Sequence, residues 1–102
     1  MEPVLSDYIV DLVHATRAPA EAGLALGRFI EFGASPRASL ALAKAARAHA
    51  LLQGAAFVRP DDVKAVGMDV LRHRVLLTWE AEAEGLDVEQ VIAQVFAKGR
   101  SP

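Results

Sequence analysis

The chain has 102 residues, of which 53% are hydrophobic and 24% are charged, and its formal net charge is −2. This length builds one domain with one core, residues 1–102, and the supply of Leu, Ile and Val excludes a disordered chain. No Lys- or Arg-rich run indicates nucleic-acid binding, and no apolar run approaches the roughly 20 residues of a membrane span.

The first predicted helix starts near Leu5 or Ser6, with Ser6 or Asp7 as its cap. It is expected to end between Thr16 and Pro19, because proline removes a backbone donor. Its apolar stripe at helical spacing consists of Tyr8, Ile9, Leu12 and Val13.

Two short strands are predicted among the helices. Residues 20–33 are the least regular stretch of the chain, but Phe29–Phe32 is aromatic and β-branched enough for a strand. Val75–Trp79 has the same character, so the two segments could pair.

The clearest predicted helix runs from Ser35 to Gln53. Ser35 is an N-cap residue, Pro36 suits the first helical position, and Gly54 supplies a left-handed stop. The expected packing face of this alanine-rich helix consists of Leu40, Leu42, Ala43, Ala46, Ala50 and Leu51.

A third helix is predicted to start at Pro60, with Asp61 and Asp62 in the first turn, where carboxylates suit the positive end of the helix dipole. Gly67 is expected to break or kink this helix, which then restarts and continues to Arg74. Its inward side chains are expected to be Val63 and Val66.

The last predicted helix begins after the cap residue Asp87, with Gln90 three residues on in the position of a capping box. Its expected buried stripe consists of Val88, Val91, Ile92, Val95 and Phe96. The elements together predict a mainly α fold, a small bundle of four or five helices with a short β-pairing.

The motifs of an independent catalyst are missing. The chain has no G-x-x-x-x-G-K-[ST] phosphate loop, no G-x-G-x-x-G, no H-E-x-x-H and no G-x-S-x-G. His14, His49 and His73 lie on different predicted helices without a second ligand three or four residues further on, so we expect no metal site. Without a phosphate loop we expect a chain that cannot hydrolyse a nucleotide alone. Cysteine is absent and no basic, apolar leader begins the chain, so we expect a cytoplasmic protein.

One cation has an unusual place, at the start of the helix that follows Ser35. Arg37 is about the second helical residue, where the aligned peptide dipoles make a positive charge cost roughly 0.3–1 kcal/mol. A helix start and a guanidinium both bind anions, so their combination indicates a phosphate held there. The alternative is an arginine that extends into water or pairs with a carboxylate such as Glu31, and spacing alone favours this alternative.

Two other charged groups have alternative interpretations. Arg72-His73-Arg74 ends a helix, where cations stabilise the negative end of the dipole; the alternative is a phosphate or subunit contact. We interpret the acidic stretch near the C-terminus as a solvated face, because no nucleophile or aromatic platform accompanies it. A partner surface or a general acid–base pair is the alternative for this stretch, which contains Glu80, Glu82, Glu84, Asp87 and Glu89.

The segment Gly-Ala-Ser-Pro-Arg-Ala, residues 33–38, resembles the sensor 2 motif in the C-terminal lid of MoxR-type AAA+ ATPases. Four other segments agree with that lid in order and spacing, so the resemblance extends over residues 5–96. They are Tyr8–Arg17, Arg59–Lys64, Val70–Arg74 and Glu80–Gly85. One departure is Arg59, which precedes a helix where the family often has a better cap such as threonine.

The resemblance implies roles for five residues. Arg37 would contact the terminal phosphate of ATP, with Pro36 and Ala38 beside it, while an upstream αβ domain holds the nucleotide and Mg²⁺. The first lid helix flanks the adenine, so Tyr8 and Ile9 are candidates for a base contact. Family members form rings, usually hexameric, and often work with von Willebrand factor A domain proteins in chaperone-like or metal-insertion roles.

The resemblance also implies a longer parent protein. The phosphate loop, the Walker B carboxylates and the arginine finger are missing, so we expect an excised lid with Met1 close to the boundary and no nucleotide bound by the lid alone. The alternative is an independent helical module that binds a partner helix in its alanine-rich groove. A helical DNA-binding domain is disfavoured by the acidic balance of the chain.

Overall fold

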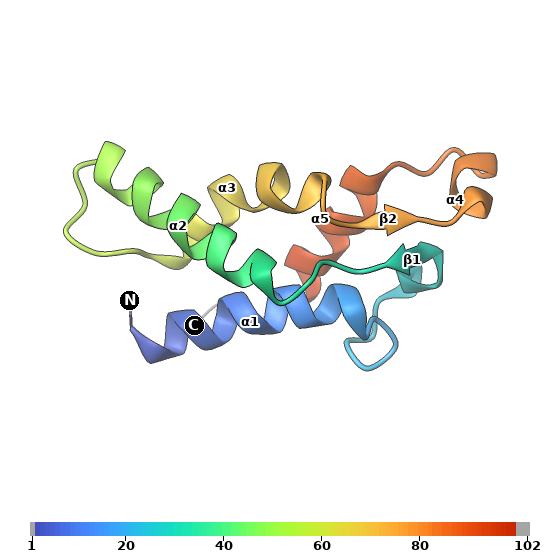
Figure 1. The fold of residues 1–102 in the computed structure, drawn as a ribbon, viewed down its shortest axis with the longest axis horizontal. Helices are drawn as coiled ribbons and strands as arrows, with labels where there is room; N and C mark the ends of the chain where they lie inside the picture. Colours follow the sequence, from blue (N-terminus) through green and yellow to red (C-terminus); the bar gives the residue numbers. More distant parts are fainter. Residues whose placement is uncertain (1, 100–102) are drawn as a thin grey trace.

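Residues 2–99, the part of the chain that the computed structural model describes, form a bundle of helices beside one small sheet (Figure 1). In chain order the elements are α1 Pro3–Arg17, the 3-10 helix η1 Ala25–Phe29, β1 Ile30–Phe32, α2 Arg37–Leu52, α3 Pro60–Arg72, β2 Leu76–Leu77, α4 Trp79–Ala83 and α5 Val88–Lys98. The predicted mainly α fold with a short β-pairing is confirmed. None of these helices is long and apolar enough to cross a membrane.

The bundle is elongated, with extents of 44 × 24 × 21 Å. The α2–α3 connection lies at one end of the long axis, and the sheet and α4 lie at the other (Figure 1). α2 and α3 form a helical hairpin, α1 packs on α2, and α5 contacts both α1 and α3. The largest fully buried apolar side chains of this core are Ile9, Leu12, Leu42, Leu71 and Ile92. Each such side chain contributes about 1.5–3 kcal/mol on burial, so the contact between these helices is the main source of stability.

α1 starts earlier than the apolar pattern predicted. It begins at Pro3, and its N-cap residue Glu2 makes no side-chain capping bond, so neither Ser6 nor Asp7 is the cap. The fixed φ of proline suits the first turn and needs no backbone donor there, which lets the helix start without a polar cap. The predicted end is confirmed, because α1 stops at Arg17, two residues before Pro19.

α2 also differs from the prediction at its start. The N-cap residue is Pro36 and the first helical residue is Arg37, so Ser35 lies one residue too early to cap the helix. The φ of −55° and ψ of −25° at Pro36 already turn the chain before the helix begins. At the other end, Gly54 has a φ of 74°, which confirms the predicted left-handed stop.

The packing face of α2 is narrower than predicted. Leu42, Ala46 and Ala50 are buried, whereas Leu40 is 67% exposed and Leu51 is 76% exposed. Leu40 lies two residues from Leu42 and therefore on another side of the helix. Leu51 lies in the last turn of α2, where its side chain extends past the packed face. The expectation that both leucines pack in the core is therefore wrong.

Gly67 does not break the third helix. α3 runs without interruption from Pro60 to Arg72, and the predicted break and restart are wrong. A Cβ atom at Gly67 would overlap the ring of Phe96 on α5, so the glycine allows that ring to approach the α3 backbone. A sequence pattern shows the missing side chain but not the aromatic ring that occupies its space.

The two predicted strands pair in an antiparallel sheet, as expected, and both are shorter than predicted. Ile30 lies opposite Leu77, and Phe32 lies opposite Leu76. The second strand stops because the Thr78 hydroxyl accepts a hydrogen bond from the Ala81 N–H at 3.3 Å and so caps α4. The sheet thus leads directly into a short acidic helix.

α5 starts as the sequence predicted. The Asp87 side chain accepts a hydrogen bond from the Gln90 N–H, and the Gln90 side chain accepts one from the Asp87 N–H, both at 2.9 Å. This reciprocal pair is the predicted capping box. Of the predicted stripe, three residues are fully buried and two are partly buried; the buried ones are Val91, Ile92 and Val95.

The start of α3 is stabilised by a buried carboxylate. Asp62 accepts a hydrogen bond from the backbone N–H of Arg59 at 2.8 Å and lies 2.7 Å from Nδ1 of His49 on α2. The N–H of Arg59, with further help from His49, lowers the pKa of Asp62 below its ordinary value. A carboxylate with a lowered pKa stabilises the fold above the pKa of the unfolded chain, about 4, and this contribution is lost as the pH falls further.

We expect Asp62→Asn to lower the free energy of unfolding at pH 7 by about 1–3 kcal/mol, because hydrogen bonds to a charged acceptor become neutral ones. Below about pH 4 the difference from the wild type should shrink, since the wild-type carboxylate becomes protonated. Urea denaturation between pH 7 and pH 2 measures both effects. The exposed neighbour variant Asp61→Asn is the control, and an equal loss in both variants would contradict a special role for Asp62.

Candidate functional site

The start of α2 is held against the end of α1 by a close backbone approach. The buried Thr16 hydroxyl donates to the Val13 carbonyl at 2.7 Å and accepts from the Ala34 N–H at 2.9 Å. A Cβ atom at Gly33 would overlap the Thr16 carbonyl, so only glycine allows the two segments to lie this close. Ala34 precedes Arg37 by three residues, so this junction sets where α2 and its arginine start.

Two backbone N–H groups in the first turn of α2 form hydrogen bonds to carbonyls of the same turn. The Ala38 N–H bonds to the Ser35 carbonyl at 2.9 Å, and the Ser39 N–H bonds to the Pro36 carbonyl at 3.1 Å. These tight turn bonds leave fewer free donors for an anion than a helix start normally offers. The attraction for a phosphate at this helix start therefore rests mainly on the guanidinium of Arg37.

Arg37 is exposed at the surface of the bundle. Within residues 2–99, no carboxylate lies at ion-pair distance from it, so the pairing with Glu31 that the sequence left open is not formed. A guanidinium presents five N–H donors in a planar fork that matches phosphate oxygens. Arg37 is thus an exposed arginine without a counter-ion in this part of the chain, as expected both for a side chain that extends into water and for one that binds a phosphate.

A hollow lies beside the start of α2. Its volume is about 290 Å³ and it lies between α1 and α2, lined by Val10, Val13, His14, Arg17, Pro36 and Ser39. A smaller hollow of about 150 Å³ adjoins it and shares Val10 and Ser39. Of the two neighbours of Arg37 in the chain, Pro36 is exposed at the surface and Ala38 is buried.

Arg17 lines this hollow, but the sequence did not predict it as a site residue. It is exposed at the end of α1, and it lines the hollow with Pro36. Its place in the segment Ala15-Thr16-Arg17, which carries part of the resemblance, was the available signal. Only the fold shows that the end of α1 lies beside the start of α2.

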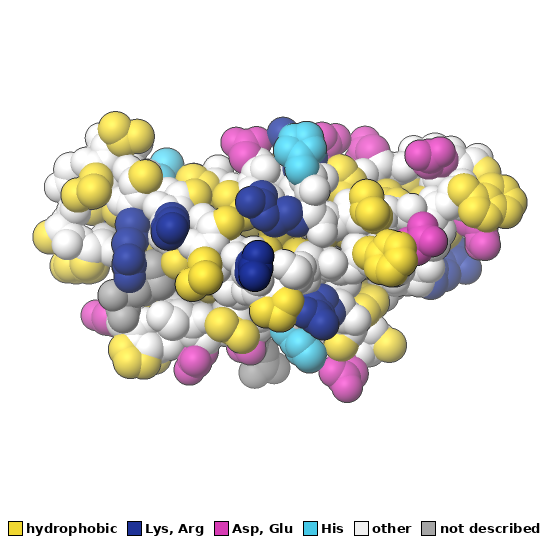
Figure 2. Space-filling view, viewed as in Figure 1, with side chains coloured by type: hydrophobic (Ala, Val, Ile, Leu, Met, Phe, Trp, Pro, Cys, Tyr) yellow, Lys and Arg dark blue, Asp and Glu magenta, His cyan; other side chains and the backbone are white. Residues whose placement is uncertain are grey.

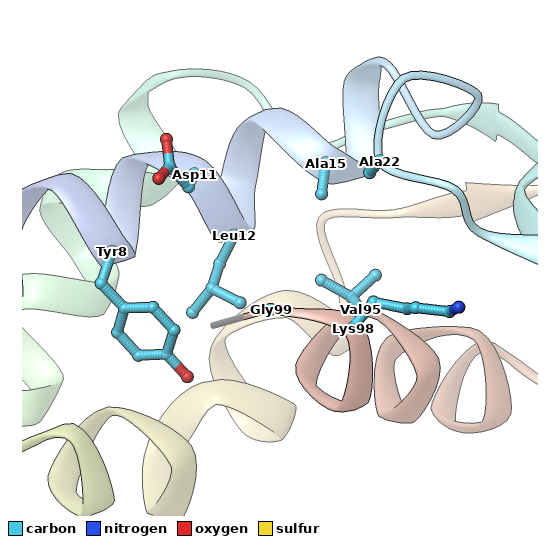
Figure 3. A pocket seen from close by; sticks show the side chains of 8 residues that line it. All are labelled: Tyr8, Asp11, Leu12, Ala15, Ala22, Val95, Lys98 and Gly99. Carbon is cyan, nitrogen blue, oxygen red and sulfur yellow. The ribbon is translucent and has the colours of Figure 1, made fainter. Parts of the chain in front are cut away.

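The two predicted base contacts lie at different cavities. Ile9 is buried and lines the smaller hollow between α1 and α2. Tyr8 is 3% exposed and lines a separate cavity of about 240 Å³ between α1 and the end of α5 (Figure 3). In that view the Tyr8 ring extends from α1 toward Gly99, and the Asp11 carboxylate points to the other side of α1, away from α5. The Tyr8 hydroxyl is buried without a hydrogen-bond partner among residues 2–99.

The cations at the end of α3 stabilise the helix, as expected from their position. Arg74 donates to the Val70 carbonyl at 2.8 Å, which satisfies one of the last carbonyls of α3. Arg72 lies 3.0 Å from Asp69 and 2.9 Å from Glu89 on α5. The acidic residues at 80, 82, 84, 87 and 89 are all exposed, which agrees both with a solvated face and with the alternative of a partner surface.

The three histidines lie apart and have different surroundings. His14 is 3.5 Å from Glu21, His49 pairs with Asp62, and His73 is exposed after the end of α3. In the described part of the chain, no group of three or more His, Cys, Asp or Glu side chains could hold a metal ion.

The comparisons with known proteins agree with this geometry. The family model of the AAA lid domain matches residues 25–95, a range that contains Arg37 and the sheet. The chain belongs to this family. The lid is of the MoxR type, because the curated relatives with that name and a solved structure match it over nearly its full length.

Three longer proteins illustrate the similarity. Chaperone MoxR1 of Mycobacterium tuberculosis is 48% identical over 93 residues, which cover 90% of the lid and 25% of that protein. Protein MoxR of Paracoccus denitrificans is 44% identical, covering 93% of the lid and 30% of that protein. A crystal structure of a proposed ATPase from Cytophaga hutchinsonii has a TM-score of 0.94 at 41% identity, covering 99% of the lid and 31% of that chain. The lid therefore spans a quarter to a third of the length of these relatives.

We expect Gly33→Ala to lower the free energy of unfolding of the lid by about 1–3 kcal/mol or more, because the new Cβ meets the α1 backbone. Urea denaturation measures the change. Ser35→Ala, two residues away, is the control and should stay within about 0.5 kcal/mol, since the Ser35 side chain makes no capping bond. A loss of about 1 kcal/mol in that control would show that Ser35 caps α2 after all.

Proposed function

We propose that this lid senses the nucleotide in a MoxR-type AAA+ ATPase and that Arg37 is its sensor 2 arginine. The observation that carries the proposal is the exposed guanidinium at the first residue of α2, unpaired within residues 2–99 and fixed through the Thr16 junction. Family membership supports it, because the segment Gly33–Ala38 has the order of residues that resembles the sensor 2 motif.

The rest of the catalytic centre belongs, in this proposal, to an AAA+ core domain outside these residues. That domain would bind ATP with Mg²⁺, and neighbouring subunits of a ring, usually hexameric, would complete the site. The relative named Chaperone MoxR1 favours a chaperone-like role for the parent protein. Metal insertion and a von Willebrand factor A domain partner remain further proposals that rest on the resemblance alone.

Arg37 would act through charge and position. Phosphoryl transfer is assisted mainly by fixed positive charge around the phosphate oxygens, and a guanidinium supplies such charge without a proton transfer. Because Arg37 is attached to a separate domain, its contact forms only when the lid closes on the core. The terminal phosphate is present before hydrolysis and absent afterwards, so the contact would favour different lid positions in the two states.

The hollow beside Pro36 is the best candidate for the neighbouring part of the nucleotide. Its walls combine the apolar side chains of Val10 and Val13 with the cation Arg17, which suits a flat base next to a phosphate chain. Ile9 lines the adjoining hollow and stays a proposed base contact. Tyr8 also stays a proposed base contact, although it lines the separate cavity on the α5 side of α1.

A second function, an independent interaction module, is favoured by the exposed leucines of α2. Leu40, Leu51 and Leu52 are all more than half exposed, which is unusual for three leucines of one helix. The two functions predict different coding sequences upstream of this domain. The lid requires an upstream reading frame that encodes a phosphate-loop domain, and the module does not.

We expect Arg37→Ala in the native-length protein to lower ATP turnover by about ten-fold or more, equivalent to at least about 1.4 kcal/mol of barrier. Steady-state phosphate release at saturating ATP measures this change. Lys44→Ala, another exposed cation of α2, is the control and should leave turnover unchanged. Normal turnover in a correctly folded Arg37→Ala protein would make Arg37 a surface residue and favour the interaction module.

We expect the isolated lid to bind a nonhydrolysable ATP analogue with a Kd weaker than about 1 mM, equivalent to less than about 4 kcal/mol of binding free energy. The reason is that most phosphate and base contacts would come from the core domain. A calorimetric titration of residues 1–102 measures this affinity. Micromolar binding would contradict the division of the site between two domains.

A further inference from the structure

Charge is distributed unevenly along this chain. Residues 33–60 contain the cations Arg37, Lys44, Arg47 and Arg59 and no carboxylate. Residues 75–97 contain five carboxylates and no Lys or Arg. The fold places the α2–α3 connection and α4 at opposite ends of the 44 Å axis, so the sequence asymmetry becomes a difference between the two ends of the molecule.

The first of these ends, the hairpin end, is apolar and basic. It consists of Arg47, Leu51, Leu52, Phe57 and Arg59, where α2 turns back into α3. Its three apolar side chains are between 68% and 85% exposed. Two hollows of about 290 and 250 Å³ open here and share Phe57, one with Arg47 in its lining and the other with Arg59 and the single carboxylate Glu2.

The opposite end, the sheet end, is apolar and mainly acidic, with Arg28 beside β1 as a cation that lies over the Phe29 ring. It consists of Phe32, Leu76, Trp79, Glu80 and Glu82. Phe32 and Leu76 are cross-strand partners, and all three apolar side chains are at least 59% exposed, with Trp79 at 76%. Trp79 is not on a loose loop, because the Thr78 hydroxyl caps its helix and Ala81 of that helix is fully buried.

The two ends carry apolar side chains and an excess of opposite charge. Figure 2 shows yellow side chains at both ends; dark blue ones outnumber magenta ones at the left, and magenta ones outnumber dark blue ones at the right. The sheet end presents protruding aromatic side chains with carboxylates, and the hairpin end presents apolar hollows with guanidinium groups. Exposed aromatic anchors, complementary pockets and opposite charges are the features that specific protein interfaces combine.

We propose that copies of this lid associate head to tail, with the sheet end of one copy docked on the hairpin end of the next. The two surfaces differ, so the contact is heterologous and leaves one free end of each kind in any open assembly. Neither end includes Arg37 or the hollow beside Pro36, so the association is independent of the proposed nucleotide contact.

The size of the ends limits the strength of the contact. The cross-section of 24 × 21 Å gives at most about 500 Å² per copy, or about 1,000 Å² in total. Interfaces below about 1,200 Å² are typically weak and transient. We therefore expect a dissociation constant of about 0.1–1 mM, which a local increase in concentration within a larger assembly would make significant.

Sedimentation of residues 1–102 from about 20 μM to 2 mM tests the proposal, over a range that spans the dissociation constants typical of small interfaces. The average mass should rise with concentration above the monomer mass of 10.9 kDa. Raising the salt to about 0.5 M should weaken the association at least about three-fold, because exposed charges are screened. A monomer at every concentration would overturn the proposal.

Two variants, each defective at one end, identify the surfaces. Trp79→Ala with Glu82→Gln disables the sheet end, and Leu51→Ser with Arg47→Gln disables the hairpin end. Each variant alone should stay monomeric, while an equimolar mixture should form a species of twice the monomer mass and nothing larger, because one intact contact remains. A mixture that stays monomeric, or a single variant that still self-associates, would refute the head-to-tail contact.

Leu40→Ser is the matched control. Leu40 is as exposed as the apolar residues of the two ends but belongs to neither of them. The control should self-associate like the wild type, and its failure to do so would point to a general hydrophobic effect and overturn the assignment. Far-UV circular dichroism of all variants should be unchanged, since every substituted side chain is exposed.

Discussion

A single buried hydroxyl, that of Thr16, connects the end of α1 to the segment that starts α2. Ala34 is fully buried, and without this acceptor its N–H would lack a partner at a cost of about 1–3 kcal/mol. The same junction requires glycine at position 33, because the α1 backbone occupies the space of a side chain. The position of Arg37 and the hollow beside Pro36 both follow from this contact.

The junction also bears on the proposed contact between Arg37 and a phosphate. A guanidinium on a rigid helix keeps its position relative to the rest of the lid, so a movement of the lid moves the charge with it. Because the first turn of α2 bonds to its own carbonyls, the side chain of Arg37 rather than the helix end carries the attraction for a phosphate. In the proposed function, the lid would therefore bring one positive charge to a partner domain.

Much of the local structure was predictable because its causes are local. The capping box of Asp87 and Gln90, the left-handed stop at Gly54 and the start of α3 at Pro60 depend on residues within one turn of each other. The wrong predictions concern contacts between distant segments. A glycine within a predicted helix suggests a break, and the local sequence around Gly67 shows no other reason for it. The reason is the ring of Phe96, which fills the space above Gly67 and lies 29 positions further along the chain.

The sequence by itself determined the helical class, the pairing of two short strands and the segment that contains Arg37. Periodicity and turn residues specify secondary structure through neighbours a few positions apart, so these features can be predicted without knowledge of the tertiary structure. Only the tertiary structure decided which leucines of α2 are exposed, that Tyr8 and Ile9 line different cavities, and that Arg17 lies beside Pro36. These features depend on how helices far apart in the chain pack together, and packing is a property of the whole core.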